Sequence, residues 1–209
     1  DEGDGTWRLA IKDVRGTPEP EYVVVDSLVG IPSSWSPDGG TILVNLLSPE
    51  SSWDIWAVPL SGDRDPAPLA TTRFREIQPQ FSPDGRFIAY VSTETGGPQV
   101  YAISHPGSTG RWQISTNGGL EPQWREDGRE IYYLTPNREL MAVSIDTEGG
   151  FEAGRPQRLF AAPVPSSIVT RNRYVAAPDG QRFLLVKPTT LGSSPTTVVL
   201  NWTAEFDAP

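Results

Sequence analysis

The chain has no cysteine, one histidine and one methionine among its 209 residues. The absence of cysteine excludes disulfide bonds, thiolate metal ligands and cysteine nucleophiles. No apolar run approaches the roughly 18 residues that a membrane-spanning helix needs, so we expect no direct membrane insertion of this segment. We recognise no targeting signal here and expect any such signal to lie outside this segment.

Basic residues are also scarce, since 17 Lys and Arg face 26 Asp and Glu, for a formal net charge of −9. Nucleic acids and anionic membrane surfaces are bound through basic patches, so we expect no nucleic-acid partner. Hydrophobic residues make up 37% of the chain and charged residues 21%, which are proportions of a folded globular protein.

Several enzyme motifs are missing: the G-x-S-x-G nucleophile elbow, the P-loop, the dinucleotide fingerprint and the EF-hand loop. The only histidine, His105, falls in a Pro/Gly-rich loop, where we expect a surface position. A Ser-His-Asp triad would have to use this residue, and no sequence motif places a nucleophilic serine in position beside it. The acidic residues at 1–5 lack the distal acidic ligand of a calcium loop, so we predict a frayed terminus there. We therefore expect no catalytic residue, no metal site, no cofactor and no enzyme activity.

A five-residue sequence motif, called the repeated phrase below, occurs four times and is the strongest signal in the chain. It reads Trp35-Ser36-Pro37-Asp38-Gly39, Phe81-Ser82-Pro83-Asp84-Gly85, Trp124-Arg125-Glu126-Asp127-Gly128 and Ala176-Ala177-Pro178-Asp179-Gly180. Its aspartates are 46, 43 and 52 residues apart, and an apolar-rich segment follows each copy. A period in the forties with several strands per period is typical of β-propeller blades.

Each period has room for four strands. In the second repeat, turn residues separate the segments 76–82, 87–92, 99–104 and 111–116, which we predict as four antiparallel strands. The first and third repeats fit the same frame, the fourth provides three strands and the start of the chain provides two, for 17 strands in all. We predict one all-β array over 1–209, a β-propeller of about four to five blades, with a partial blade at 1–30, blades at 31–72, 73–117 and 118–162, and a partial blade at 163–209.

The partial blades at the two ends leave two explanations open. The strand at 22–28 could complete the last blade and close a four-bladed ring, with one strand left over. Alternatively, this segment is part of a larger propeller, which we favour because the leftover strand has no place in a closed ring. An unpaired sheet edge also favours edge-to-edge homodimers, and light scattering that found a strict monomer at high concentration would count against them.

The repeated phrase has the chemistry of a folding motif. We expect Trp35, Phe81 and Trp124 to pack between neighbouring blades, where burial of an aromatic side chain stabilises by about 2–3 kcal/mol. Asp-Gly then makes the turn, because Gly adopts positive φ and Asp accepts a hydrogen bond from the backbone two residues on. The four aspartates lie around a ring, too far apart to share one metal ion.

The phrase and two further segments, Asp54-Ile55-Trp56-Ala57-Val58 and Gln99-Val100-Tyr101-Ala102-Ile103, resemble the TolB-like, WD-repeat-like propeller family over about residues 31–187. The stretch 196–202 resembles the ends of bacterial proteins in which a propeller follows a serine/threonine kinase or winged-helix domain and a membrane segment. The resemblance implies an extracytoplasmic sensor or binding domain with a protein or peptide partner. Similar propellers also cover serine peptidases of the prolyl-oligopeptidase type, whose catalytic residues belong to a separate domain.

The candidate ligand-binding residues are polar and lie just before the phrase, on the predicted innermost strands. They are Gln78, Gln80, Glu121, Gln123, Arg171 and Arg173. Two interpretations stay open, a hydrated channel lining and a polar channel mouth that binds a peptide, with the arginines receiving a carboxylate. We favour a non-enzymatic protein- or peptide-binding or sensor module of a larger bacterial protein. The alternative is a substrate-gating propeller of a serine peptidase whose catalytic domain lies outside this segment.

Overall fold

The computed structural model describes residues 9–14, 16, 19–23, 30–48, 52–62, 65–166, 173–187 and 196–200. Within these ranges the regular elements are all β-strands. In chain order they are β1 (Leu9–Ile11), β2 (Glu21–Val23), β3 (Gly30–Trp35), β4 (Thr41–Ser48), β5 (Ser52–Pro59), β6 (Ala67–Ala70), β7 (Glu76–Phe81), β8 (Phe87–Ser92), β9 (Gln99–Ser104), β10 (Arg111–Gln113), β11 (Leu120–Trp124), β12 (Glu130–Leu134), β13 (Glu139–Asp146), β14 (Glu152–Ala153), β15 (Gln157–Ala161), β16 (Tyr174–Ala176), β17 (Arg182–Val186) and β18 (Thr196–Leu200). In the described part of the chain, no helix has the length and apolar character needed to cross a bilayer.

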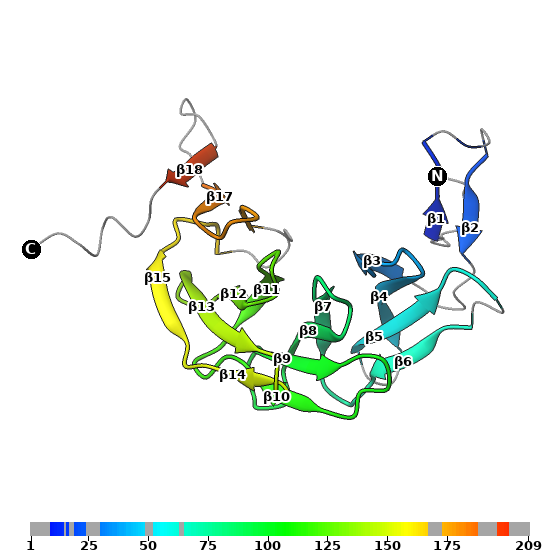
Figure 1. Ribbon diagram of the computed structural model, residues 1–209, viewed down its shortest axis with the longest axis horizontal. Helices are drawn as coiled ribbons and strands as arrows, with labels where there is room; N and C mark the ends of the chain where they lie inside the picture. Colours follow the sequence, from blue (N-terminus) through cyan, green and yellow to red (C-terminus); the bar gives the residue numbers. More distant parts are fainter. Residues whose placement is uncertain are drawn as a thin grey trace, which may run out of the picture.

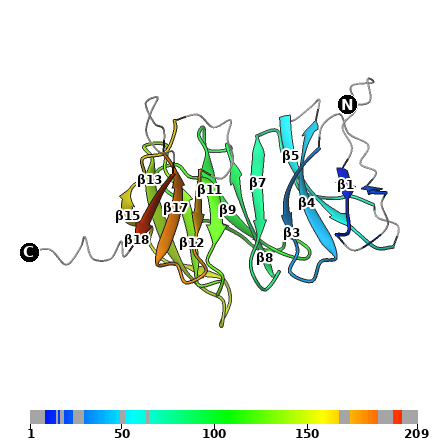
Figure 2. The same cartoon turned by 90° about the horizontal axis from the view of Figure 1, so that it is seen from above.

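The strands form five antiparallel sheets that follow one another along an open arc (Figure 1). The sheets are β1-β2, β3-β4-β5-β6, β7-β8-β9-β10, β11-β12-β13-β15 with β14 paired to the end of β13, and β16-β17-β18. The strands β3, β7 and β11 lie on the concave side, and β6, β10 and β15 lie on the convex side. Seen from above, the successive sheets stand side by side (Figure 2). The architecture is that of a β-propeller with partial blades at both ends, as the repeat predicts.

The hydrophobic core lies between adjacent sheets. Side chains alternate between the two faces of a strand, so neighbouring residues of one strand enter two different layers. Tyr132 and Tyr133 of β12 show this most clearly, since each is 1% exposed and they belong to different clusters. The same division occurs in β8, where Ile88 faces the preceding sheet and Ala89 faces the following one. Burial on both faces explains why these strands read as continuous apolar runs.

The Asp-Gly turns follow the expected chemistry in all four copies. Asp38, Asp84, Asp127 and Asp179 each accept a hydrogen bond from the backbone N–H two residues on, at 2.9–3.0 Å. In the first two copies a serine joins the turn, and Ser36 Oγ donates to Asp38 Oδ1 at 2.5 Å while accepting from the N–H of Thr41 at 2.9 Å. The hydrogen bond from Ser36, followed by that from the backbone of Gly40, lowers the pKa of Asp38.

The turns also contact one another from sheet to sheet. A Cβ atom on Gly85 would stand 3.4 Å from Cδ of Pro37, and one on Gly128 would stand 3.9 Å from Cδ of Pro83. The proline of one turn therefore lies against the glycine of the next. Gly85 itself has φ +73°, in the left-handed region that non-glycine residues rarely adopt.

Two expectations need correction. Trp35 is not wedged between sheets but 51% exposed, because the described residues of the preceding sheet form only β1 and β2. Its indole instead donates to Gly39 O at 2.8 Å. Over the described residues the strand count is 18 rather than 17, because β14 is an additional strand of two residues. β2 pairs with β1, and over the described residues no fourth strand joins the β16-β17-β18 sheet.

The positive φ of Gly85 and its contact with Pro37 predict that a substitution at this position destabilises the fold. We expect Gly85→Ala to lower the free energy of unfolding by about 1–2 kcal/mol, because alanine is strained at positive φ. Urea denaturation measures this change. Gly97→Ala is the matched control, because no heavy atom lies within 4 Å of its Cβ position. An equal loss at both glycines would contradict the role assigned to Gly85.

Candidate functional site

The inner strands carry two positions at which the repeats differ, and these positions build the candidate site. The first inner position comprises Pro32, Gln78, Glu121 and Arg173, and the second comprises Ser34, Gln80, Gln123 and Val175. In β3, β7 and β11 the pairing register with the next strand shifts at this point, which marks a β-bulge. Gln78 and Glu121 adopt positive φ, 57° and 54°, which is uncommon outside glycine.

Backbone amides at the first inner position are bound by side chains of the preceding sheet. Asn45 Oδ1 accepts from the N–H of Gln78 at 3.3 Å, and Gln78 Oε1 accepts from the N–H of Glu121 at 2.8 Å. Glu121 Oε2 in turn accepts from the N–H of Arg173 at 2.8 Å. A bulge leaves such amides without a ladder partner, and a buried unpaired amide is costly. These side chains therefore join each sheet to the next.

A second series of hydrogen bonds uses the second inner position. Ser34 Oγ accepts from the N–H of Phe81 at 3.2 Å, and Gln123 Oε1 accepts from the N–H of Ala176 at 3.2 Å. Gln123 Nε2 also donates to the carbonyl oxygen of Tyr174 at 2.6 Å. Both the oxygen and the nitrogen of the Gln123 amide thus bind the backbone of the last sheet.

A buried ion pair connects the sheet that begins with β11 to the β16-β17-β18 sheet. Arg173 Nε lies 2.5 Å from Glu121 Oε1, and the two residues are 3% and 5% exposed. Arg173 also donates through Nη1 to Pro165 O at 2.9 Å. Tyr174 adds a hydrogen bond from its hydroxyl to Glu121 O at 2.8 Å. The Glu121 carboxylate thus binds Arg173 through both oxygens, whereas Arg173 Nη2 is buried without a hydrogen-bond partner in the structure.

A pocket of about 80 Å³ lies among the inner strands β3, β7 and β11. It is lined by Pro32, Ser33, Gln78, Pro79, Gln80, Glu121, Pro122 and Gln123. Four of the six candidate residues from the sequence thus meet at one pocket: Gln78, Gln80, Glu121 and Gln123. Arg173 does not line it but holds Glu121, and Arg171 lies outside the described residues.

The sequence interpretation missed Asn45, which is fully buried. In the sheet that begins with β3, Pro32 occupies the first inner position, and Asn45 supplies the side-chain acceptor for the next sheet. Asn45 accepts from the Gln78 backbone and from Ser33 Oγ at 3.0 Å, and donates to Glu76 O at 3.3 Å. Its signal in the sequence is a carboxamide inside the apolar run of β4. Proline offers no side-chain acceptor, so a residue on the neighbouring strand supplies one.

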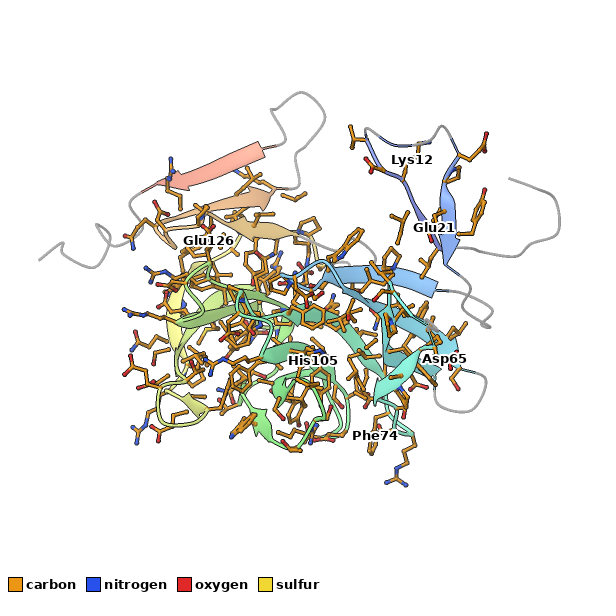
Figure 3. All side chains as sticks on the ribbon, turned by 45° about the vertical axis from the view of Figure 1, so that its right-hand side comes forward. Lys12, Glu21, Asp65, Phe74, His105 and Glu126 are labelled. Carbon is orange, nitrogen blue, oxygen red and sulfur yellow. The ribbon has the colours of Figure 1, made fainter. Side chains whose placement is uncertain are left out.

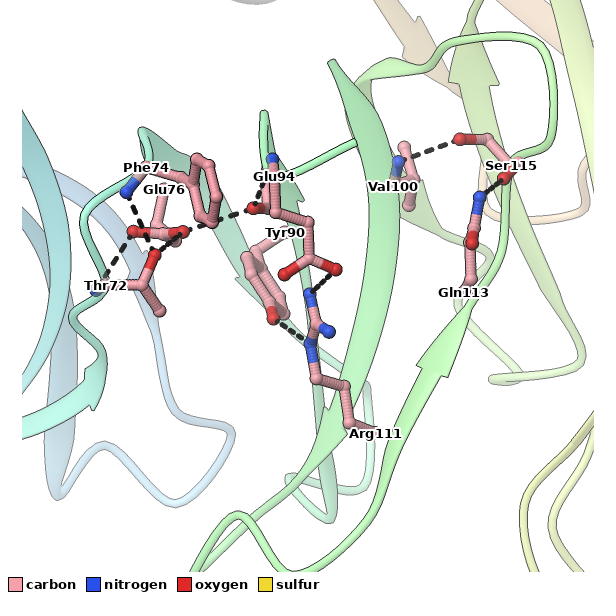
Figure 4. A network of polar contacts seen from close by, with 10 residues as sticks. Thr72, Phe74, Glu76, Tyr90, Glu94, Val100, Arg111, Gln113 and Ser115 are labelled. Atoms are coloured by element: carbon pink, nitrogen blue, oxygen red, sulfur yellow. Dashed lines mark hydrogen bonds and ion pairs between the residues drawn. The ribbon is translucent and has the colours of Figure 1, made fainter. Parts of the chain in front are cut away.

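Glu76, at the start of β7, is a buried carboxyl group that accepts hydrogen bonds from hydroxyls. Thr72 Oγ1 donates to it at 2.7 Å and Ser92 Oγ at 3.1 Å, and the side chain is 1% exposed (Figure 4). Burial is the main cause that raises the pKa of Glu76, and the negative charge of Asp54 adds to it. The hydrogen bonds from Thr72 and Ser92 act in the opposite direction without cancelling the rise.

His105 lies in the turn that follows β9, as expected, and is partly buried rather than fully exposed (Figure 3). Its ring packs edge-on against Phe81, with ring centroids 5.2 Å apart. Nδ1 is buried and has no hydrogen-bond partner. Burial lowers the pKa of His105, against the opposing effect of Asp38. No nucleophile contacts the ring through this nitrogen, so the geometry adds nothing to a catalytic interpretation.

Two other concavities contain none of the candidate residues. A groove of about 950 Å³ between β1 and β3 is lined mainly by apolar side chains such as Leu9, Ile31 and Trp35. A pocket of about 610 Å³ between the turns of neighbouring sheets has an acidic lining that includes Glu126 and Asp146. Among the described residues, no group of three or more His, Asp or Glu is arranged to hold a metal ion.

Comparisons with known proteins bear on the family and the fold. The family described as the TolB beta propeller domain matches residues 5–153. The Tol-Pal system protein TolB of Anaeromyxobacter dehalogenans is 30% identical over 124 residues, which are 58% of this chain and 27% of that protein. A tricorn protease homolog of Streptomyces coelicolor is 40% identical over 68 residues, 32% of this chain and 6% of that protein. The chain thus spans less than a third of either curated relative.

A solved structure gives the same architecture. The crystal structure of TolB from Acinetobacter baumannii superposes with a TM-score of 0.62 over 88% of this chain and 43% of that one, at 17% sequence identity. At this identity the likeness concerns the fold alone.

The buried ion pair predicts a large stability loss when one partner is neutralised. We expect Glu121→Gln to lower the free energy of unfolding by about 3–5 kcal/mol, because Arg173 keeps its charge in a buried place. Glu126→Gln, in an exposed turn of the same sheet, should change it by less than about 0.5 kcal/mol. Chemical denaturation of both variants measures the difference, and similar losses would contradict the assigned role of Glu121.

Burial of Glu76 predicts a pH dependence of stability. Because its folded-state pKa is raised above the ordinary value of 4.5, its contribution to stability is fully present below that value. The contribution is lost as the pH rises through the folded-state pKa. We expect the stability of Glu76→Gln relative to the unsubstituted protein to increase over that interval, as measured by denaturation at several pH values. A difference that does not vary with pH would contradict the assignment.

Proposed function

The chain belongs to the TolB beta propeller domain family, and on that premise we propose that it is a non-enzymatic binding module that receives part of a protein or peptide partner at the pocket among β3, β7 and β11. The observation that carries the proposal is the convergence of Gln78, Gln80, Glu121 and Gln123 on this one pocket. The two residues with positive φ, Gln78 and Glu121, are among them. Such backbone strain recurs at binding sites, which supports a site here.

The size of the pocket favours a macromolecular partner. Small-molecule sites usually enclose about 300–1,000 Å³. A pocket of about 80 Å³ has room for a side chain or a short stretch of chain, and the remaining contacts must come from the surrounding rim. A protein loop or a peptide provides both.

The charge of the pocket favours a neutral polar contact. Its only ionisable lining residue is Glu121, whose carboxylate already binds Arg173. The remaining lining residues are amides, prolines and one serine. This modifies the expectation from the sequence that arginines receive a ligand carboxylate, since Arg173 binds Glu121 and does not line the pocket.

We further propose the setting in which the module works. The repeat supports a division into blades at 31–72, 73–117 and 118–162 with partial blades at 1–30 and 163–209. The likeness to TolB and to the ends of bacterial multidomain proteins supports an extracytoplasmic sensor role within a larger protein. The three-stranded last sheet supports edge-to-edge pairing of two copies, for which light scattering is the test.

A second candidate function is the gating of a serine peptidase by the propeller. The observation in its favour is the 40% identity with the tricorn protease homolog over 68 residues. The adjoining sequence of the intact protein separates the two candidates. A hydrolase domain with a nucleophile elbow favours gating, whereas a kinase or winged-helix domain with a membrane span favours the sensor.

Selection of peptides tests the binding function. We expect phage-displayed random peptides to yield binders to the whole chain that no longer bind Gln80→Trp, because the indole fills the pocket. Fluorescence anisotropy of labelled synthetic peptides measures the affinities. Gln113→Trp, on the convex strand β10, is the control and should bind normally. Failure to select any peptide, or equal binding to both variants, would argue against the proposed pocket.

A further inference from the structure

We propose that Gln80 is the residue with which the pocket recognises its ligand, and that it does so through two hydrogen bonds to an amide N–H and a carbonyl oxygen that lie side by side in an extended peptide. This inference rests on the proposed function and names the chemistry of the same pocket. It separates one recognition residue from neighbours that look equivalent in the sequence.

The argument begins with the polar groups around the pocket that are already engaged. Gln123 uses its oxygen for Ala176 N and its nitrogen for Tyr174 O. Glu121 binds Arg173 through both oxygens, and Gln78 Oε1 accepts from Glu121 N. These groups join the sheets, so a ligand could use them only by breaking contacts between blades.

Gln80 differs from its counterparts at the second inner position. Ser34 and Gln123 each bind the backbone of the following sheet, whereas the side chain of Gln80 makes no hydrogen bond in the structure. It is partly buried and lines the pocket. A partly buried carboxamide without a partner has unused donors and an unused acceptor at the place where a ligand enters.

The chemistry of a carboxamide determines what it can pair with. Gln80 offers one acceptor and an NH₂ donor side by side, an arrangement that complements another amide in two parallel hydrogen bonds. Gln78 Nε2, which no residue engages, adds donors nearby. The walls formed by Pro32, Pro79 and Pro122 have no backbone N–H to offer. A ligand group that both donates and accepts is therefore the best match.

A donor and an acceptor that point the same way have two sources in an extended peptide: the backbone N–H and C=O of one residue, and the side-chain carboxamide of Asn or Gln. Both sources can pair with a primary amide in two hydrogen bonds, so the structure assigns the shared chemistry. N-methylation of single backbone nitrogens removes the first source, and replacement of Asn or Gln in the peptide by Leu removes the second.

The test uses a peptide selected on the unsubstituted chain and compares Gln80→Met with Gln123→Met. Methionine has a similar length but lacks the amide. We expect Gln80→Met to weaken peptide binding at least about tenfold, as two lost hydrogen bonds imply, while the denaturation midpoint stays unchanged. Gln123→Met should lower the midpoint, because it removes contacts to Tyr174 and Ala176.

The peptide variants complete the cycle. One N-methylated position, or one Asn or Gln replacement, should weaken binding to the unsubstituted chain and have little further effect on Gln80→Met. Peptides that bind both forms equally would overturn the role of Gln80 and leave the binding function standing. If random peptides yield no binder at all, the binding function fails and this inference fails with it.

Discussion

The need to satisfy backbone amides at the bulges of the inner strands is the constraint on which the array depends. A bulge turns an N–H out of the ladder of its own sheet, and such a group is almost always paired in a folded protein. Here the partner is a side chain of the preceding sheet, as Gln78 Oε1 is for the amide of Glu121 at 2.8 Å. Apolar layers between the sheets supply non-directional attraction, whereas these hydrogen bonds fix how far one sheet slides against the next. The polar residues that make these bonds on the concave side are therefore structural, and the proposed binding role falls to a residue that makes none, Gln80.

The arrangement of the core follows from the same stacking of sheets. Tyr132 and Tyr133 are adjacent in β12, yet they are buried in two different layers. Each middle strand must supply apolar side chains on both faces, so a polar residue within it, such as Asn45 of β4, is informative. Glu76, at the start of the inner strand β7, is an equally buried polar residue, and both take part in hydrogen bonds that cross between elements. The cost of burying them is offset where every polar atom finds a partner, and for Glu76 the raised pKa records the part that is not offset.

Local features could be predicted from the sequence, and contacts between sheets could not. The turn chemistry of Asp38 and Asp84 depends on residues within a few positions, and the structure contains the expected hydrogen bonds. The positions that surround the pocket were also identified, because they lie at a constant offset from the repeated phrase. The sequence did not indicate which of these residues bind the next sheet and which do not. Gln80 and Gln123 are the same residue type at equivalent positions, and they differ only in the groups that the next sheet places beside them. Trp35 was mispredicted for a related reason, because the burial of an aromatic side chain depends on the strand opposite it.

The series of acceptors has a direction and a last member. Asn45, Gln78 and Glu121 each hold the amide that follows, but Arg173 occupies the same inner position with a side chain that can only donate. Arg173 thus binds the Glu121 side chain of the preceding sheet, but its own side chain cannot accept a hydrogen bond from an amide of a following sheet. Any strand that packs beyond β16 must find another acceptor for its own amide, which makes the two faces of the array chemically unlike. The order of the blades is consequently not interchangeable, even though their outlines repeat.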